Sequence, residues 1–136
     1  EEIDVQDPSE DLAARLADAY GVCAAGQKPG LSPALVLEMS AAATRDSGIA
    51  SALEAFDTAV RDDIIEWLHR RDKAGGRKRV KNRLAGRALM LQCLIDGLKI
   101  RQTREPRLDR KLLRSALAEI LSTLLQDGTQ ESSRPR

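Results

Sequence analysis

The sequence has few aromatic residues and few cysteines. Its 136 residues include one Trp, one Tyr and one Phe, and the two cysteines, Cys23 and Cys93, do not form a CxxC motif. A shortage of aromatic residues beside abundant Ala, Leu and Arg favours helices over strands. Two isolated cysteines are typical of free thiols in a reducing compartment, so we expect a cytoplasmic protein without structural disulfides.

Long apolar runs are also missing. No stretch approaches the roughly 18 apolar residues that a membrane-spanning helix needs, and no signal peptide is recognisable. The composition, 42% hydrophobic and 32% charged, is that of a globular chain long enough for one domain with a real core. We therefore expect one domain over residues 9–126, a lead-in at 1–8, a flexible tail at 127–136 and no membrane partner.

Helical periodicity is the main positive signal in the sequence. Apolar residues recur at spacings of three and four between groups of Ser, Asp, Gly and Pro. The pattern predicts an all-α fold of five main helices in an antiparallel bundle. They are one after "DPSEDL", one with Ser32 as N-cap, one from Ile49 to about Lys73, one from about Lys81 to Arg104, and one with Asp109 as N-cap.

The fourth and fifth predicted helices carry more apolar surface than the other three can cover. "ALMLQCLIDGL" leaves only Gln92 and Asp96 polar between residues 88 and 98, and the fifth helix has a double apolar row from residue 112 to 125. A second copy of the chain would cover both helices in an intermolecular four-helix bundle. We therefore predict a homodimer whose interface contains Leu91, Ile95, Gly97, Leu98, Leu113, Leu117, Ile120 and Leu124.

The segment "DLAARLADAYGV" is similar to the first helix and turn of a helix-turn-helix DNA-binding motif. A recognition helix would have to follow it directly. The next residues instead include Gly26, Pro29, Gly30 and Pro33, which leave no room for a helix of two turns. We therefore do not expect this segment to read DNA.

A ligand pocket inside a helical domain needs apolar, adaptable walls and a few polar groups. Met, Cys and Phe side chains suit such walls because they tolerate ligands of different shapes. The hydroxyl of Tyr20 or the amide of Gln92 could orient a ligand, although all these residues could instead simply fill the core. The candidate ligand-binding residues are Tyr20, Met39, Phe56, Val60, Met90 and Cys93.

The sequence offers little for catalysis or metal binding. His69, the only histidine, forms one Glu-x-x-His pair with Glu66, whereas a di-iron site needs two such pairs and further carboxylates. No serine lies in a nucleophile-elbow context, and "AGGRKRVKN" lacks the spacing and the hydroxyl of a phosphate-binding loop. We therefore expect no enzyme activity, no catalytic or metal-binding residue and no cofactor.

Charge is unevenly distributed along the chain. Residues 1–69 hold 4 basic and 14 acidic side chains, whereas residues 70–136 hold 18 basic and 7 acidic ones. A basic cluster between residues 70 and 83 could contact phosphates, although it lacks aromatic partners for stacking on single strands. Two halves that pack through complementary surfaces, with a solvated basic loop beside an acidic third helix, explain the same pattern.

Two segments resemble the C-terminal domain of TetR-type transcriptional regulators. "LSPALVLEMSAAATRDSGIASAL" followed by "RDDIIEWLHR" is similar to the second and third helices of that domain. "LAGRALMLQCLIDGLKIRQTREPRLDRKLLRSALAEIL" is similar to its last two helices, and is closest to the betaine-repressor-like subgroup.

The resemblance implies a regulatory domain, in the manner of a repressor. Such a domain dimerises through its last two helices and holds a small, often apolar effector among the earlier ones. Operator DNA would be a partner only through an N-terminal helix-turn-helix domain, which has no counterpart in these residues. Two alternatives stay open: a helical homodimerisation or adaptor protein without a ligand, and a helical nucleic-acid-binding protein that uses the basic loop.

Overall fold

The computed structural model describes residues 8–24, 32–76 and 81–125. These residues form five helices and no strand: α1 (Pro8–Ala24), α2 (Pro33–Ala43), α3 (Ser47–Ala74), α4 (Lys81–Arg104) and α5 (Arg110–Leu125). The prediction of an all-α fold with five main helices is confirmed. The predicted lead-in, apart from Pro8, and the predicted tail lie outside the described residues.

Two of the helix starts follow from local capping. Ser32 precedes α2, and its hydroxyl oxygen accepts a hydrogen bond of 3.1 Å from the backbone N–H of Leu35, while Pro33 takes the first helical position. Asp109 precedes α5, and its carboxylate accepts a hydrogen bond of 2.8 Å from the N–H of Lys111. Both predicted caps are confirmed.

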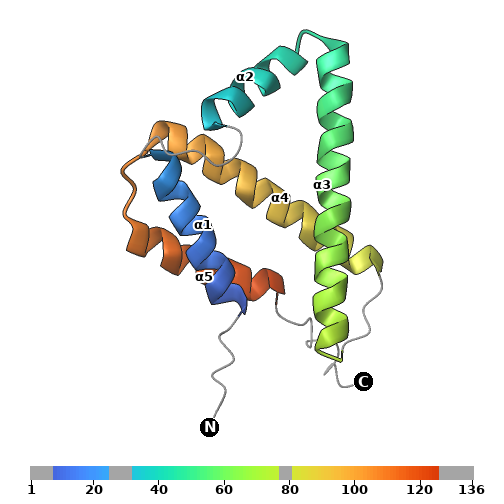
Figure 1. Ribbon diagram of the computed structural model, residues 1–136, viewed down its shortest axis with the longest axis vertical. Coiled ribbons are helices and arrows are strands. Elements are labelled where there is room, and N and C mark those ends of the chain that lie inside the picture. Colours follow the sequence, from blue (N-terminus) through green and yellow to red (C-terminus); the bar gives the residue numbers. More distant parts are fainter. Residues whose placement is uncertain (1–7, 25–31, 77–80, 126–136) are drawn as a thin grey trace, which may run out of the picture.

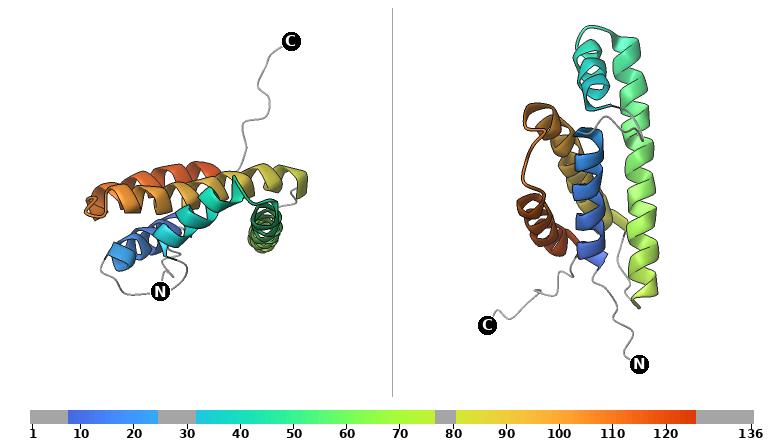
Figure 2. Two further views of the ribbon diagram at one scale, coloured as in Figure 1. Left: turned by 90° about the horizontal axis from the view of Figure 1, so that it is seen from above. Right: turned by 60° about the vertical axis from the view of Figure 1, so that its left-hand side comes forward.

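Helix α4 is central to the arrangement, because it packs against each of the other four helices. It crosses the long α3 diagonally, and α2 runs between the first turns of α3 and the C-terminal part of α4 (Figure 1). Seen from above, α4 and α5 lie in one layer and α1 and α2 in another (Figure 2). Helix α1 packs mainly against α5.

The core lies between α1, α4 and α5. Ala13 and Ala17 of α1 are buried, and their small side chains allow a close approach of the neighbouring helix. Leucines at four-residue intervals form the matching buried row of α5: Leu113, Leu117, Leu121 and Leu125. Helix α2 is different, since none of its residues is buried. The end of the molecule formed by α2 is therefore thinly packed.

None of the helices in the described part of the chain combines the length and apolar character needed to span a membrane.

Candidate ligand-binding site

A cavity of about 760 Å³ lies between α2, α3 and α4. Its walls are mainly apolar, with Leu35 and Met39 from α2, Phe56 and Val60 from α3, and Ile95 from α4. The volume falls within the range of roughly 300–1,000 Å³ that is usual for small-molecule sites.

Part of the apolar wall remains in contact with solvent. Phe56 is 55% exposed and Leu35 is 41% exposed, although both line the cavity. Covering such surface is favourable by about 25 cal/mol per Å² of apolar area removed from water. Binding of an apolar ligand that fills this space would therefore be favourable.

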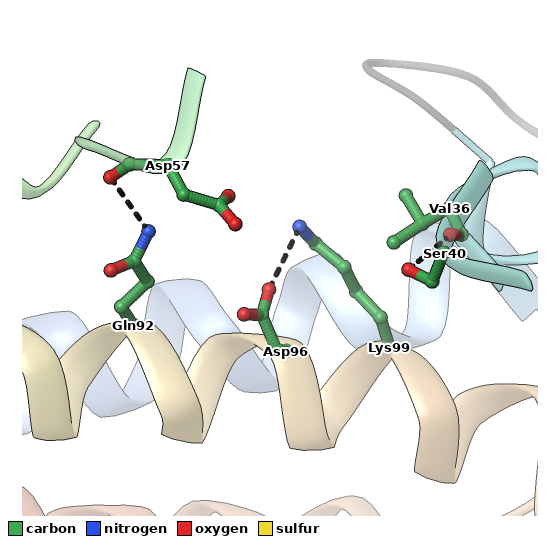
Figure 3. Close-up of polar contacts among 6 residues, drawn as sticks. All are labelled: Val36, Ser40, Asp57, Gln92, Asp96 and Lys99. Atoms are coloured by element: carbon green, nitrogen blue, oxygen red, sulfur yellow. Dashed lines mark hydrogen bonds and ion pairs between the residues drawn. The ribbon is translucent and has the colours of Figure 1, made fainter. Parts of the chain in front are cut away.

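Most of the polar lining residues come from α3 and α4, while Glu38 and Ser40 come from α2 (Figure 3). The amide of Gln92 joins the two helices, because its Nε2 donates to the backbone carbonyl of Asp57 at 3.0 Å and its Oε1 accepts from Nε of Arg61 at 3.0 Å. Gln92 is buried and lines the cavity. Both ends of its amide are already engaged, so its first role is to hold α3 and α4 at their crossing.

Two charged groups follow Gln92 along the same face of α4. The Nζ of Lys99 lies 3.6 Å from a carboxylate oxygen of Asp96, and both residues line the cavity. The carboxylate of Asp57 is directed toward this pair from α3 (Figure 3). These groups form a polar region on the α3–α4 side of a mainly apolar cavity, the combination that orients small ligands.

Three of the six predicted ligand-binding residues line the cavity, namely Met39, Phe56 and Val60. Met90 is 54% exposed and Cys93 is also exposed, and neither belongs to the lining. They lie on the other face of α4 from Gln92 and Ile95, since residues two apart on a helix are about 200° apart.

Tyr20 lies in the core rather than in the cavity. Its hydroxyl donates a hydrogen bond of 2.6 Å to the backbone carbonyl of Glu105, which follows the last residue of α4. The amide of Gln102 in turn donates a hydrogen bond of 2.6 Å to the carbonyl of Tyr20. Burial, with the nearby carboxylate of Glu105, raises the pKa of the Tyr20 hydroxyl, against a smaller lowering effect of Arg101. The two hydrogen bonds connect α1 to the end of α4.

Sequence reasoning missed Asp57, Asp96 and Lys99 as lining residues. A signal for the α4 side was present, because residues 92, 95, 96, 99 and 100 share one helical face. The sequence does not show which face of α4 borders the cavity, because α4 has apolar residues on both faces.

The predicted dimer interface divides between buried and exposed positions. Gly97 and Ile120 are exposed, and an added Cβ at Gly97 would meet no atom within 4 Å. The other predicted interface residues belong to the chain's own core or to the cavity wall: Leu91, Ile95, Leu98, Leu113, Leu117 and Leu124. The interface itself stays a prediction.

Apolar rows remain uncovered on both of the last two helices. Exposed apolar or small residues recur along α4 at spacings of three and four, and Leu112 of α5 is 62% exposed. The uncovered positions include Leu89, Met90, Cys93, Gly97 and Ile100 on α4, and Leu112, Ala116 and Ile120 on α5.

The end of α3 contains the only histidine of the sequence and part of the basic cluster. The guanidinium of Arg71 lies over the ring of Trp67, 5.9 Å from its centroid, as in a cation–π contact. No group of three or more His, Cys, Asp or Glu side chains within the described ranges could hold a metal ion. Residues 77–80, the middle of the basic cluster, lie outside those ranges.

Neither a family model, nor a curated protein, nor a solved structure matches the chain in comparisons with known proteins.

Proposed function

We propose that this chain is the effector-binding and dimerisation domain of a TetR-type transcriptional regulator. The cavity between α2, α3 and α4 is the observation that carries the proposal. It is large enough for a small molecule, its walls are mainly apolar, and a few polar groups line it. The helical order and the sequence resemblance of the last two helices agree with this assignment.

Helix α4 would link the three parts of such a domain. One face lines the cavity with Gln92 and Lys99, another carries the uncovered row with Gly97, and its last turn holds α1 through Gln102. An effector that displaces α4 would therefore change both the contact with α1 and the surface available to a second copy. Operator binding would belong to an N-terminal helix-turn-helix domain, as in that family.

A cavity-filling variant tests the proposal. Ala52 lines the cavity, whereas Ala55, three residues later on α3, is exposed and does not. A thermal-shift screen of small apolar compounds should find ligands that raise the melting temperature of the wild-type chain and of Ala55→Trp, but not of Ala52→Trp.

Stabilisation at a ligand concentration of 100 times the Kd is worth about 2.7 kcal/mol, which such a screen detects. Ligands that stabilise Ala52→Trp as well as the wild type would place binding outside the cavity. A dimer that binds no compound in the screen would favour the homodimerisation or adaptor alternative.

A further inference from the structure

The turn between α4 and α5 carries a second concentration of basic residues, outside the cluster at residues 70–83. Residues 101–114 contain six basic side chains and only two acidic ones, Glu105 and Asp109. Both carboxylates have local partners: Glu105 lies 3.6 Å from a guanidinium nitrogen of Arg101, and Asp109 caps α5. The remaining basic residues, which we call the basic corner, are Arg104, Arg107, Arg110, Lys111 and Arg114.

All five side chains of the basic corner are exposed, and none has an ion-pair partner among the described residues. Arg110 and Lys111 lie in the first turn of α5, which holds no acidic residue. Cations at this end of a helix oppose the helix dipole and reduce stability. The charge of the basic corner is therefore neither neutralised nor favoured by the fold itself.

One acidic surface of the chain lies on α3. Asp62, Asp63 and Glu66 are exposed on α3 and have no ion-pair partner within the described residues. The long α3 and the α4–α5 turn lie on opposite sides of the molecule (Figures 1 and 2). The sequence suggested that an acidic and a basic half of the chain pack against each other, but these two surfaces do not. The molecule therefore has a basic end and an acidic side.

We propose that the basic corner binds the phosphate backbone of duplex nucleic acid without reading its sequence. Four of its five residues are arginines, whose planar guanidinium groups bind phosphate oxygens in a two-pronged geometry. Residues 101–114 contain no aromatic side chain, so stacking on the bases of single strands is not available. The acidic side of α3 would be repelled by the same polyanion, which fixes which end of the molecule approaches it.

The proposal predicts a steep dependence of binding on salt. Five phosphate contacts give a slope of about −4.5 in a plot of log K against log salt concentration. Affinity should then fall about 500-fold between 50 and 200 mM salt, and equally for duplexes of unrelated sequence.

The test measures fluorescence anisotropy of labelled duplexes of about 20 base pairs, titrated with the whole chain. One triple variant removes three charges from the basic corner: Arg107→Gln, Arg110→Gln and Arg114→Gln. A matched triple variant removes the same charge from the other basic cluster: Arg77→Gln, Lys78→Gln and Arg79→Gln. Unchanged circular dichroism and melting temperature show that each variant is folded.

The basic-corner variant should bind at least about tenfold more weakly at 50 mM salt, and its salt slope should fall to about −1.8. The matched variant should stay within about twofold of the wild type at the same salt. An equal or larger loss in the matched variant would overturn the proposal in favour of the cluster at residues 70–83.

Binding that is absent, or as strong to single strands as to duplexes, would also overturn the proposal. So would a chain that binds vesicles of phosphatidylserine and phosphatidylcholine through the basic corner but does not bind duplexes. None of these outcomes involves the cavity, so they do not bear on the proposed function. The tests on Ala52, in turn, do not bear on nucleic-acid binding by the basic corner.

Discussion

The side-chain amide of Gln102 and the backbone carbonyl of Tyr20 join α4 to α1 through a hydrogen bond of 2.6 Å. Gln102 follows the cavity residue Lys99 by one helical turn. In a second hydrogen bond between the same two segments, the Tyr20 hydroxyl donates to the backbone carbonyl of Glu105. A displacement of α4 at the cavity would therefore be transmitted to α1 through these two hydrogen bonds.

Removing the Gln102 amide should loosen this connection. Gln102→Leu keeps a similar volume but removes the side-chain hydrogen bond to the carbonyl of Tyr20, so we expect a loss of about 0.5–1.5 kcal/mol in the free energy of unfolding. Urea denaturation followed by circular dichroism measures it. Thr103→Ala, at the next, exposed position, is the control and should change the free energy by less than about 0.5 kcal/mol. Equal effects of the two substitutions would show that the connection contributes nothing.

Stability should fall at alkaline pH because of Tyr20. Its pKa in the folded chain is raised above the ordinary value of 10.0, so the unfolded chain loses this proton first as the pH rises. The stabilising contribution is therefore complete below pH 10 and is lost as the pH rises through the raised pKa.

Tyr20 is the only tyrosine, so absorbance of the phenolate reports its ionisation directly. The titration midpoint in the native chain should lie above the midpoint in concentrated urea. Tyr20→Phe should remove this part of the alkaline loss of stability. Coincident native and urea midpoints would contradict the buried, hydrogen-bonded state of Tyr20.

The hydrogen bonds of the Gln92 amide, which we call the brace between α3 and α4, should make a measurable contribution to stability. Gln92→Leu removes the side-chain hydrogen bond to the carbonyl of Asp57 and the acceptor of the Arg61 Nε. We expect a loss of about 1–2 kcal/mol in the free energy of unfolding, and weaker binding of any cavity ligand because the crossing of α3 and α4 is less defined. Met90→Leu is the control on the same helix, since Met90 is exposed and away from the cavity. A Gln92→Leu variant as stable as this control would show that the brace contributes nothing.

How far the sequence predicts this structure depends on whether a signal is local. Capping by Ser32 and Asp109 and the limits of α4 could be predicted because a helix end is decided by its neighbouring residues. The third helix is predicted to begin at Ile49, yet α3 begins at Ser47, because the carboxylate of Asp46 accepts from the N–H groups of Gly48 and Ile49 and caps the helix. A cap and a break share the same residue types, which explains this miss.

The partner of each helix face could not be predicted in the same way. Periodicity shows that Tyr20 faces inward, and this residue is indeed buried, but not that it meets the end of α4 85 residues later. The placement of Met90 and Cys93 met the same difficulty. Both faces of α4 are apolar, so composition alone does not say which one borders the cavity and which one stays open.

The uncovered apolar rows predict the oligomeric state. Leu112→Glu combined with Ile120→Glu places two charges on the exposed row of α5. We expect the wild-type chain to sediment as a dimer at micromolar concentration. Burying unpaired charges in an interface is strongly unfavourable, so the variant should sediment as a monomer. Ala55→Glu, at an exposed position on α3, should leave the dimer intact. A monomeric wild-type chain would exclude the bundle of four helices.

The two methionines provide the most direct test of the central claim, that one surface of the domain binds a ligand and another binds a second copy. Met39 lines the cavity, and Met90 lies on the open row of α4. With 13C-labelled methionine methyl groups, a compound that stabilises the chain should shift the Met39 signal, and dilution of the free chain should shift the Met90 signal. A ligand that shifts only Met90, or that shifts neither methyl group, would contradict the account.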